Sequence, residues 1–189
     1  MAVLKIESTG SDTLERVNKI MAGFPSGAYK AVWGAMRRAT ASAKTEAGRF
    51  AAGEYNISKG TFMARTAVKT RMSGGSGGVA SVSVTFSGQV IPLIAFGAKG
   101  GPGGVSVTVK RNGGHATLGR AFQAAIYGNV GIWEREGRPR FPVEQLYGPS
   151  TGHMMQNENV VEQMDETIER VFSARLEHEM LRLMNGWGG

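Results

Sequence analysis

The spacing of apolar residues changes twice along the chain, and this change constrains the fold more than any other feature of the sequence. Residues 27–53 and 159–184 carry apolar side chains at steps of three and four, which is typical of amphipathic helices. Residues 79–86 alternate apolar and hydroxyl side chains, which predicts a strand with a period of two. We therefore expect an α+β protein, with N-terminal helices and a long C-terminal helix packed on an antiparallel β-sheet with extended Gly-rich loops.

The first long helix is expected to pack closely, because its apolar line consists mostly of small side chains. That line is Val32, Met36, Ala39, Ala43, Ala47 and Phe50. Before it, residues 3–6 read as a short strand, and Ser11 or Asp12 can cap a helix that ends at residues 23–25. After it, Ser58 can cap a short third helix that extends to residue 67.

The middle of the chain is expected to hold an antiparallel sheet of about five strands. Besides residues 79–86, the expected strands are residues 90–96, 105–109, 130–134 and 140–146, the last two joined by a turn at 137–139. Residues 118–126 favour a short helix or irregular chain. The composition of residues 73–78 favours a flexible linker, and the Gly-rich residues 97–104 favour a mobile hairpin tip between strands.

These elements are expected to form one domain over residues 1–189. Its three parts are a basic helical part (1–72), a β-sheet part (79–147) that includes the loop 97–104, and a closing helix (159–185).

Charge is distributed unevenly along the chain. The net charge is +7 overall, with +7 in residues 1–72, +3 in residues 73–159 and −3 in residues 160–189. A chain with one basic end and one acidic end can pair its own ends or bind other copies head to tail. The basic excess also suggests a polyanion as partner, although ordinary solvated faces explain it equally well.

The composition excludes several protein classes. The chain has no cysteine, which excludes disulfides and thiolate metal sites. Residues 1–10 lack the pattern of a signal peptide, and no apolar run reaches the ~18 residues of a membrane span. We therefore expect a soluble intracellular protein that does not bind a membrane.

No constellation of catalytic residues is evident, and we expect a protein that is not an enzyme and needs no cofactor or metal. The histidines His115, His153 and His178 show no ligand spacing. Residues 148–152 (GPSTG) formally fit the G-x-S-x-G nucleophile pattern, but proline before Ser150 favours a helix-entry signal instead. The loop 97–104 lacks the lysine and hydroxyl ending of a phosphate-binding loop.

Residues 134–150, EREGRPRFPVEQLYGPS, resemble the minor tail protein Z family of tailed bacteriophages and prophages, which is related to tail-completion and head–tail joining proteins. The features that carry the resemblance are the Arg-x-Gly-x-x-Arg-Phe-Pro-Val strand pair, the Gly-Pro-Ser turn and the following helix rich in Glu and Arg. In layout the resemblance extends over the whole chain, but it is specific only for residues 132–183. The Gly-rich segments 73–78 and 97–104 have no counterpart in it.

The resemblance implies a structural protein of the virion, at the head-proximal end of the tail or in the neck, assembled in the bacterial host cytoplasm. Related joining proteins form six-fold rings through which double-stranded genomic DNA passes. The implied partners are other copies of the chain, a tail terminator or tail tube protein, and head–tail adaptor proteins.

In such a ring, the basic strand pair can meet the acidic face of the last helix, in the same copy or in a neighbouring one. The expected interface residues are Arg135, Arg138, Arg140, Pro142, Tyr147, Gly148, Pro149, Ser150, Glu162, Glu166 and Glu169. Pro142 and Pro149 are expected to mark where strand pairing begins and ends. Stabilisation of the subunit alone would also explain this junction.

The residues expected to face DNA are Lys99, Lys110, Arg111, Arg37 and Arg38. Their contacts would be with phosphate and would weaken with salt. The alternative function is a non-sequence-specific intracellular nucleic-acid-binding module.

Overall fold

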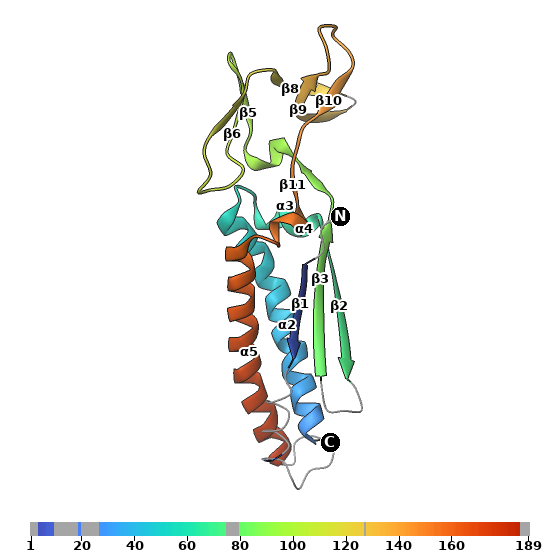
Figure 1. Cartoon of the computed structure of the whole chain (residues 1–189), viewed down its shortest axis with the longest axis vertical. Coiled ribbons are helices and arrows are strands. Elements are labelled where there is room, and N and C mark those ends of the chain that lie inside the picture. The colour runs from blue at the N-terminus through green and yellow to red at the C-terminus, as the bar shows by residue number, and fades with distance from the viewer. Residues whose placement is uncertain (1–3, 10–18, 20–26, 75–79, 127, 186–189) are drawn as a thin grey trace.

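Two long helices form the body of the molecule. The computed structural model describes residues 4–9, 19, 27–74, 80–126 and 128–185. Helices α2 (Gly27–Glu54) and α5 (Glu158–Met184) run side by side in opposite directions along the long axis (Figure 1). Both match helices that the sequence predicts, and together with the antiparallel strands they confirm the α+β class.

The close packing expected for α2 is confirmed. Alanines recur at every fourth position of its buried face, and each is at most 1% exposed: Ala31, Ala35, Ala39, Ala43, Ala47 and Ala51. From α5, Val160, Met164 and Leu176 are buried, and Ile168 and Phe172 pack against the same core. Small side chains let two helices or a helix and a sheet approach closely, because no bulky group holds them apart.

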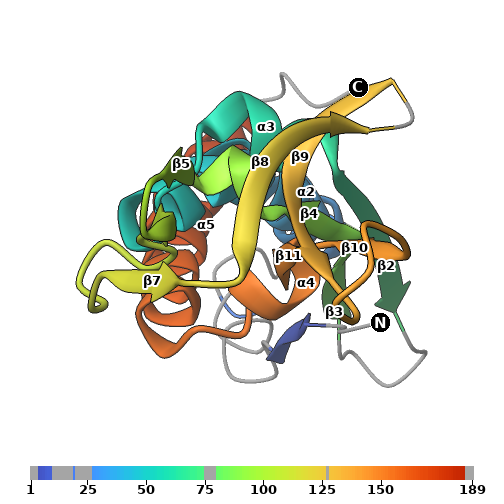
Figure 2. The same cartoon turned by 90° about the horizontal axis from the view of Figure 1, so that it is seen from above.

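A three-stranded antiparallel sheet packs on α2. Its order is β1-β3-β2, formed by β1 (Leu4–Thr9), β3 (Ala80–Gly88) and β2 (Thr66–Gly74). The alternation predicted for β3 is confirmed, because Val82, Val84 and Phe86 are buried. The long helices lie on one side of this sheet (Figure 2). Strand β2 was not expected, because the sequence pattern predicts no strand at residues 66–74.

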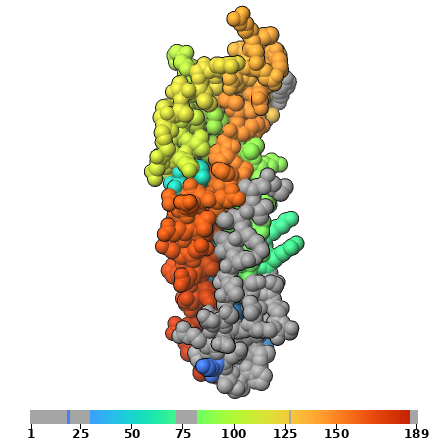
Figure 3. All heavy atoms as spheres, viewed as in Figure 1, coloured from blue at the N-terminus to red at the C-terminus, as the bar shows by residue number. Residues whose placement is uncertain are grey.

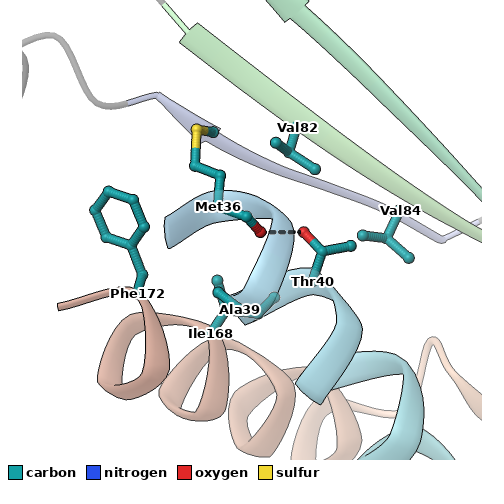
Figure 4. Close-up of a pocket in the computed structure, with 7 residues that line it drawn as sticks. All are labelled: Met36, Ala39, Thr40, Val82, Val84, Ile168 and Phe172. Carbon is teal, nitrogen blue, oxygen red and sulfur yellow. Dashed lines mark hydrogen bonds between the residues drawn. The ribbon is translucent and has the colours of Figure 1, made fainter. Parts of the chain in front are cut away.

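The interior where α2, α5 and β3 meet is almost completely filled. Seven residues line a cavity of about 20 Å³ (Figure 4): Met36, Ala39, Thr40, Val82, Val84, Ile168 and Phe172. This volume is roughly that of a single water-sized probe. Thr40 Oγ1 donates to the carbonyl of Met36 at 2.8 Å, so the polar side chain in the lining has a partner within its own helix.

Three further small sheets form the other end of the molecule, so the expected single five-stranded sheet is wrong. One pairs β4 (Val90–Pro92) with β11 (Tyr147–Ser150). A second contains β5 (Lys99–Gly101), β6 (Gly104–Val107) and β7 (Ala116–Leu118). The third contains β8 (Ala121–Ile126), β9 (Asn129–Arg135) and β10 (Val143–Gln145).

Three local predictions need correction. Only the start of residues 90–96 is a strand, and the 3₁₀ helix η1 (Leu93–Phe96) follows it, because a short apolar run alone does not distinguish a strand from a buried helix. Residues 118–126 lie in strands β7 and β8, apart from their connection. The helix capped by Ser58 is α3 (Lys59–Ala64), which ends three residues earlier than expected.

Within the Gly-rich residues 97–104, Lys99–Gly101 form β5 and Gly104 begins β6; the segment therefore contains the turn of a hairpin, as predicted, together with one of its strands, which was not predicted. The predicted helix at residues 11–22 lies almost wholly outside the described residues, as do positions 75–78 of the predicted linker and the tail 186–189. Positions 73 and 74 of that linker are instead the end of strand β2, paired with β3. Among the described helices, none is both long and apolar enough to cross a membrane.

Candidate subunit interface

The arginines expected at an interface lie together on one hairpin at the end of the molecule. Arg135 is the last residue of β9, opposite Val143 of β10. Arg138 and Arg140 lie in the connection between these strands, residues 136–142; this agrees with the turn predicted at 137–139 for Arg138, whereas Arg140 was expected in a strand. All three side chains are exposed. We call Arg135, Arg138 and Arg140 the hairpin arginines.

Aromatic rings, not carboxylates, hold two of these guanidinium groups. The guanidinium carbon of Arg135 lies 4.8 Å from the ring centre of Phe122, and that of Arg140 lies 5.8 Å from the ring centre of Phe141. Such contacts orient an arginine while its charge stays available. The nearby carboxylate of Glu134 instead pairs with Arg120, whose Nε lies 3.4 Å from Glu134 Oε1.

Large apolar side chains are exposed around the same end of the molecule. Phe141 is 51% exposed, Tyr147 is 49% exposed and Val130 is 58% exposed. The Tyr147 hydroxyl donates to Gln145 Oε1 at 2.9 Å, which keeps the ring at the surface. Exposed aromatic side chains together with arginine, as at Phe141 and Arg140, are the composition that protein interfaces favour.

The segment from Tyr147 to Ser150 connects this end of the molecule to the helical body. A side chain at Gly148 would place its Cβ 2.5 Å from Cε2 of Phe96, so only glycine fits. Pro149 lies where the pairing of β11 with β4 becomes irregular, and Pro142 directly precedes β10. Pro142 thus stands where pairing begins, as predicted, whereas Pro149 lies inside a strand and not after one.

Ser150 caps a helix, which supports the helix-entry interpretation of the Gly-Pro-Ser turn. Its Oγ accepts a hydrogen bond from the backbone N–H of His153 at 3.2 Å, at the start of α4 (Thr151–Met154). Asn157 then caps α5 in the same way, through its side chain and the N–H of Asn159. The turn therefore leads first into a four-residue helix and only then into the long one.

The acidic residues expected to meet the hairpin lie on the exposed face of α5. Glu162, Glu166 and Glu169 are exposed, and the exposed Asp165 lies among them. Partial burial raises the pKa of the Asp165 carboxyl above its usual value. We call Glu162, Glu166 and Glu169 the α5 glutamates.

The chain does not join these two surfaces to each other. Within the described residues, no ion pair connects a hairpin arginine with an α5 glutamate. The sheet with the hairpin lies at one end of the molecule, and α5 extends away from it toward the other end (Figure 1). Pairing of the chain's own ends through these residues is therefore not seen.

The residues expected to face DNA are spread over three places. Lys99 lies on β5, Lys110 and Arg111 lie in a turn near the end of α2, and Arg37 and Arg38 lie in the first half of α2. Arg111 Nε donates to the carbonyl of Ala52 at 2.7 Å, and Arg38 Nε lies 3.8 Å from Glu179 Oε1. These five residues are exposed but do not form one surface.

The histidines show no metal-site geometry. In the described part of the chain, no group of three or more His, Asp or Glu side chains could hold a metal ion. His115 Nε2 lies 2.5 Å from Ser106 Oγ, and His115 Nδ1 lies 3.0 Å from Thr108 Oγ1, so two hydroxyls of the β6 segment hold the ring. His153 lines an open polar hollow beside Tyr55, and burial raises the pKa of that tyrosine.

Two features of the structure have no counterpart in the sequence analysis. Glu179 of α5 is buried at 7% exposure between the two long helices. Strand β2 presents the exposed cations Lys69 and Arg71 at alternate positions. The alternation of residues 65–71 (RTAVKTR) could have indicated a strand, but the preceding helix signal at Ser58 masked it.

Comparison with known proteins adds no relative. No protein-family model, no curated protein and no solved structure matches the chain. The resemblance to tail proteins is therefore carried by the residues that define it, and not by a matched homologue.

Proposed function

We propose that the protein is a structural component of a tailed bacteriophage virion, a tail-completion or neck protein at the head-proximal end of the tail. Copies of the chain assemble into a ring that joins head and tail and surrounds the passing double-stranded DNA. The resemblance of residues 134–150 to tail proteins suggests this role. The observation that supports it best is the pair of complementary exposed surfaces, the hairpin arginines and the α5 glutamates, which have no ion pair with each other within the chain.

Surfaces of opposite charge at different places on one molecule favour head-to-tail contacts. Each copy would use its hairpin arginines on one neighbour and its α5 glutamates on the other. Such a heterologous contact generates a ring when the rotation between copies closes. In a closed ring all copies lie at the same position along the ring axis. The hairpin end of one copy can therefore reach helix α5 of the next copy only if the long axis of each molecule is tilted toward the plane of the ring.

Charge alone would not hold the ring together. An exposed ion pair contributes about 0–1 kcal/mol and weakens with salt, so three such pairs orient the subunits more than they bind them. Phe141 lies against Arg140, while Val130 on β9 and Tyr147 on β11 are exposed farther from the arginines; buried at a contact, these residues would supply apolar area. At about 25 cal/mol per Å², burying such residues contributes more than the ion pairs do.

Electron microscopy of virions from a phage that lacks this gene, beside the wild type, tests the proposal. Filled heads with separate or unjoined tails are expected. Normal, infectious particles would contradict the proposal and favour the alternative of a nucleic-acid-binding module. Complementation of the deletion with the wild-type gene is the control, because it excludes an effect on neighbouring genes.

A further inference from the structure

The face of strands β2 and β3 that points away from the long helices is basic. Every second residue of the segment that leads into and along β2 is exposed: Arg65, Ala67, Lys69 and Arg71. The residues between them, Thr66, Val68 and Thr70, are half-buried, as alternation on a strand requires. In Figure 3, side chains of the β2 segment project from the surface beyond the rest of the sheet. We call Arg65, Lys69 and Arg71 the sheet cations.

The neighbouring strand offers hydroxyl groups on the same face. Ala67 pairs with Ser87, Lys69 with Thr85 and Arg71 with Ser83. Directly opposite residues of an antiparallel pair have Cβ atoms about 5 Å apart, so both cations of β2 have a hydroxyl side chain beside them. Ammonium, guanidinium and hydroxyl groups are all hydrogen-bond donors, which suits an acceptor-rich anion.

The upper end of this face is hollowed. A shallow, open hollow of about 730 Å³ lies where α3 leads into β2, and it is lined by Ala64, Arg65, Thr66, Ala67, Ser87, Gly88 and Gln89. Glycine is required at position 88, because a Cβ there would collide with Thr151 Oγ1 and with the carbonyl oxygen of Arg65. The face therefore combines a flat basic strand with a recess that contains Arg65 and polar groups.

Within the part of the chain that the structure describes, the sheet cations have no acidic partner, since none of the ion pairs there involves one of them. Strands β2 and β3 contain no acidic residue. On β1, Lys5 is opposite Thr85 and Glu7 is opposite Ser83 in the strand register.

We propose that this face binds the phosphate backbone of double-stranded DNA without reading its sequence. Lys69 and Arg71 lie about 7 Å apart along the strand. Duplex DNA carries a charge about every 1.7 Å of its axis, so the two cations can reach phosphates at many positions along the duplex, whatever its sequence. Proteins that grip single strands stack bases on aromatic rings. The described residues of β2 and β3 on this face include no aromatic side chain, because Phe86 points to the core.

In the proposed ring, this face would line the passage for DNA. Its biological setting therefore rests on the proposed function. The hairpin arginines and the α5 glutamates serve contacts between copies in that proposal, and the sheet cations lie on neither element. The acidic helix of another copy is the competing occupant of the face. Beside the cations, the described positions of β2 and β3 on this face are Ala67 and hydroxyl residues, so an acidic helix would find little apolar area to pack on, whereas phosphate oxygens need only hydrogen-bond donors.

Fluorescence anisotropy of the full-length protein with a random-sequence 40-base-pair duplex, over a salt series, tests the proposal. The variant Arg65→Gln, Lys69→Gln, Arg71→Gln removes three exposed charges. Each phosphate contact contributes about 0.9 to the slope of log K against log salt concentration, so the slope should become shallower by about 2 to 3. The affinity at about 50 mM salt should fall at least tenfold. An oligo-dT strand should bind more weakly than the duplex.

The matched control is Arg135→Gln, Arg138→Gln, Arg140→Gln, which lowers the net charge equally at the other end of the molecule. It should keep DNA binding and fail to complement the gene deletion, if the proposed function is also correct. Equal loss of DNA binding in both variants, or no binding of duplex by the wild type, overturns the inference. A sheet variant that keeps DNA affinity but loses self-association in sedimentation would show that the face binds another copy. None of these three binding results bears on whether deletion of the gene leaves tails unjoined.

Discussion

At the scale of single residues, small side chains do most to define this molecule. The alanines of α2 recur at every fourth position and are all buried, so the helix meets its neighbours through a smooth face. Close contact over that face gains dispersion energy at many atoms, each contribution being about 0.1–0.2 kcal/mol. These positions therefore lack space for a larger side chain, although leucine has nearly the same helix propensity as alanine.

Replacement of one buried alanine should destabilise the protein. Ala43 is 0% exposed, so Ala43→Leu is expected to lower the free energy of unfolding by about 1–3 kcal/mol through overpacking. Urea denaturation followed by circular dichroism measures the change. Ala41→Leu is the control, because Ala41 is exposed on the same helix and its replacement should change stability by less than about 0.5 kcal/mol. Equal effects at both positions would contradict the packing argument.

Ser150 is expected to act as a helix cap and not as a nucleophile. Ser150→Ala removes the acceptor for the N–H of His153 and should cost about 1 kcal/mol of stability. Ser150→Asn should restore most of that loss, because asparagine also caps helices. Thermal unfolding of the three proteins measures both changes. A large loss of stability with Asn, equal to that with Ala, would argue against the capping role.

At the scale of elements, the pairing of α2 with α5 includes one buried charge. Glu179 Oε2 lies 3.2 Å from Arg182 Nη2 on the same helix, and Glu179 Oε1 lies 3.8 Å from Arg38 Nε on α2. Gly34 of α2 makes room for it, since a Cβ at that position would lie 3.2 Å from Glu179 Cδ. The carboxylate therefore links the two helices through its pairing with Arg38 of α2.

Removal of this charge should weaken the helix pair modestly. Both arginines are about half exposed, so solvent screens the ion pairs, and Glu179→Gln is expected to cost about 1 kcal/mol. Arg182→Gln should cost more than Arg38→Gln, because its distance to the carboxylate is shorter. Urea unfolding at constant ionic strength compares the three variants. If Glu179→Gln proves more stable than the wild type, desolvation of the carboxylate outweighs its ion pairs.

At the scale of the whole molecule, the separation of the two charged surfaces decides what contacts are possible. The hairpin arginines lie at one end, while the α5 glutamates lie along the helix that leads away from it. A contact between copies then joins different surfaces, so an open chain of copies keeps one free surface of each kind, at its two ends, until the ring closes. This arrangement makes a charge-exchange experiment possible.

Two variants with opposite charge reversals should each fail to restore infection when expressed alone, and should restore it when expressed together. One variant carries Arg135→Glu, Arg138→Glu and Arg140→Glu, and the other carries Glu162→Lys, Glu166→Lys and Glu169→Lys. In a ring built from one variant alone, the hairpin surface and the α5 surface carry the same charge and repel each other. In an even-numbered ring in which the two variants alternate, every contact again joins surfaces of opposite charge. Complementation of the gene deletion, measured as infectious titre, should be low with either variant and should rise by tenfold or more when both are expressed.

Titres that stay at the wild-type level with either variant alone would show that these surfaces do not meet. Failure of the mixture, with both variants folded as judged by circular dichroism, would contradict this particular pairing. That result would not test the tail-completion role itself, which the deletion experiment tests.

Local patterns determined the helices α2 and α5, the strand β3 and the caps at Ser58 and Ser150, because each depends on residues within a few positions of one another. They also determined which charges exist on which segment. The apolar residues 90–96 were ambiguous between strand and helix, and β2 was hidden behind a helix signal.

The tertiary structure alone decided how these pieces are arranged in space. Four small sheets formed instead of one, because strand pairing depends on partners distant in the sequence. The burial of Glu179, the scatter of the five residues expected to face DNA, and the gathering of Arg65, Lys69 and Arg71 on one sheet face follow from that pairing. A sequence specifies the side chains and their local periodicity, but contacts between distant segments depend on packing, which no short window of residues contains.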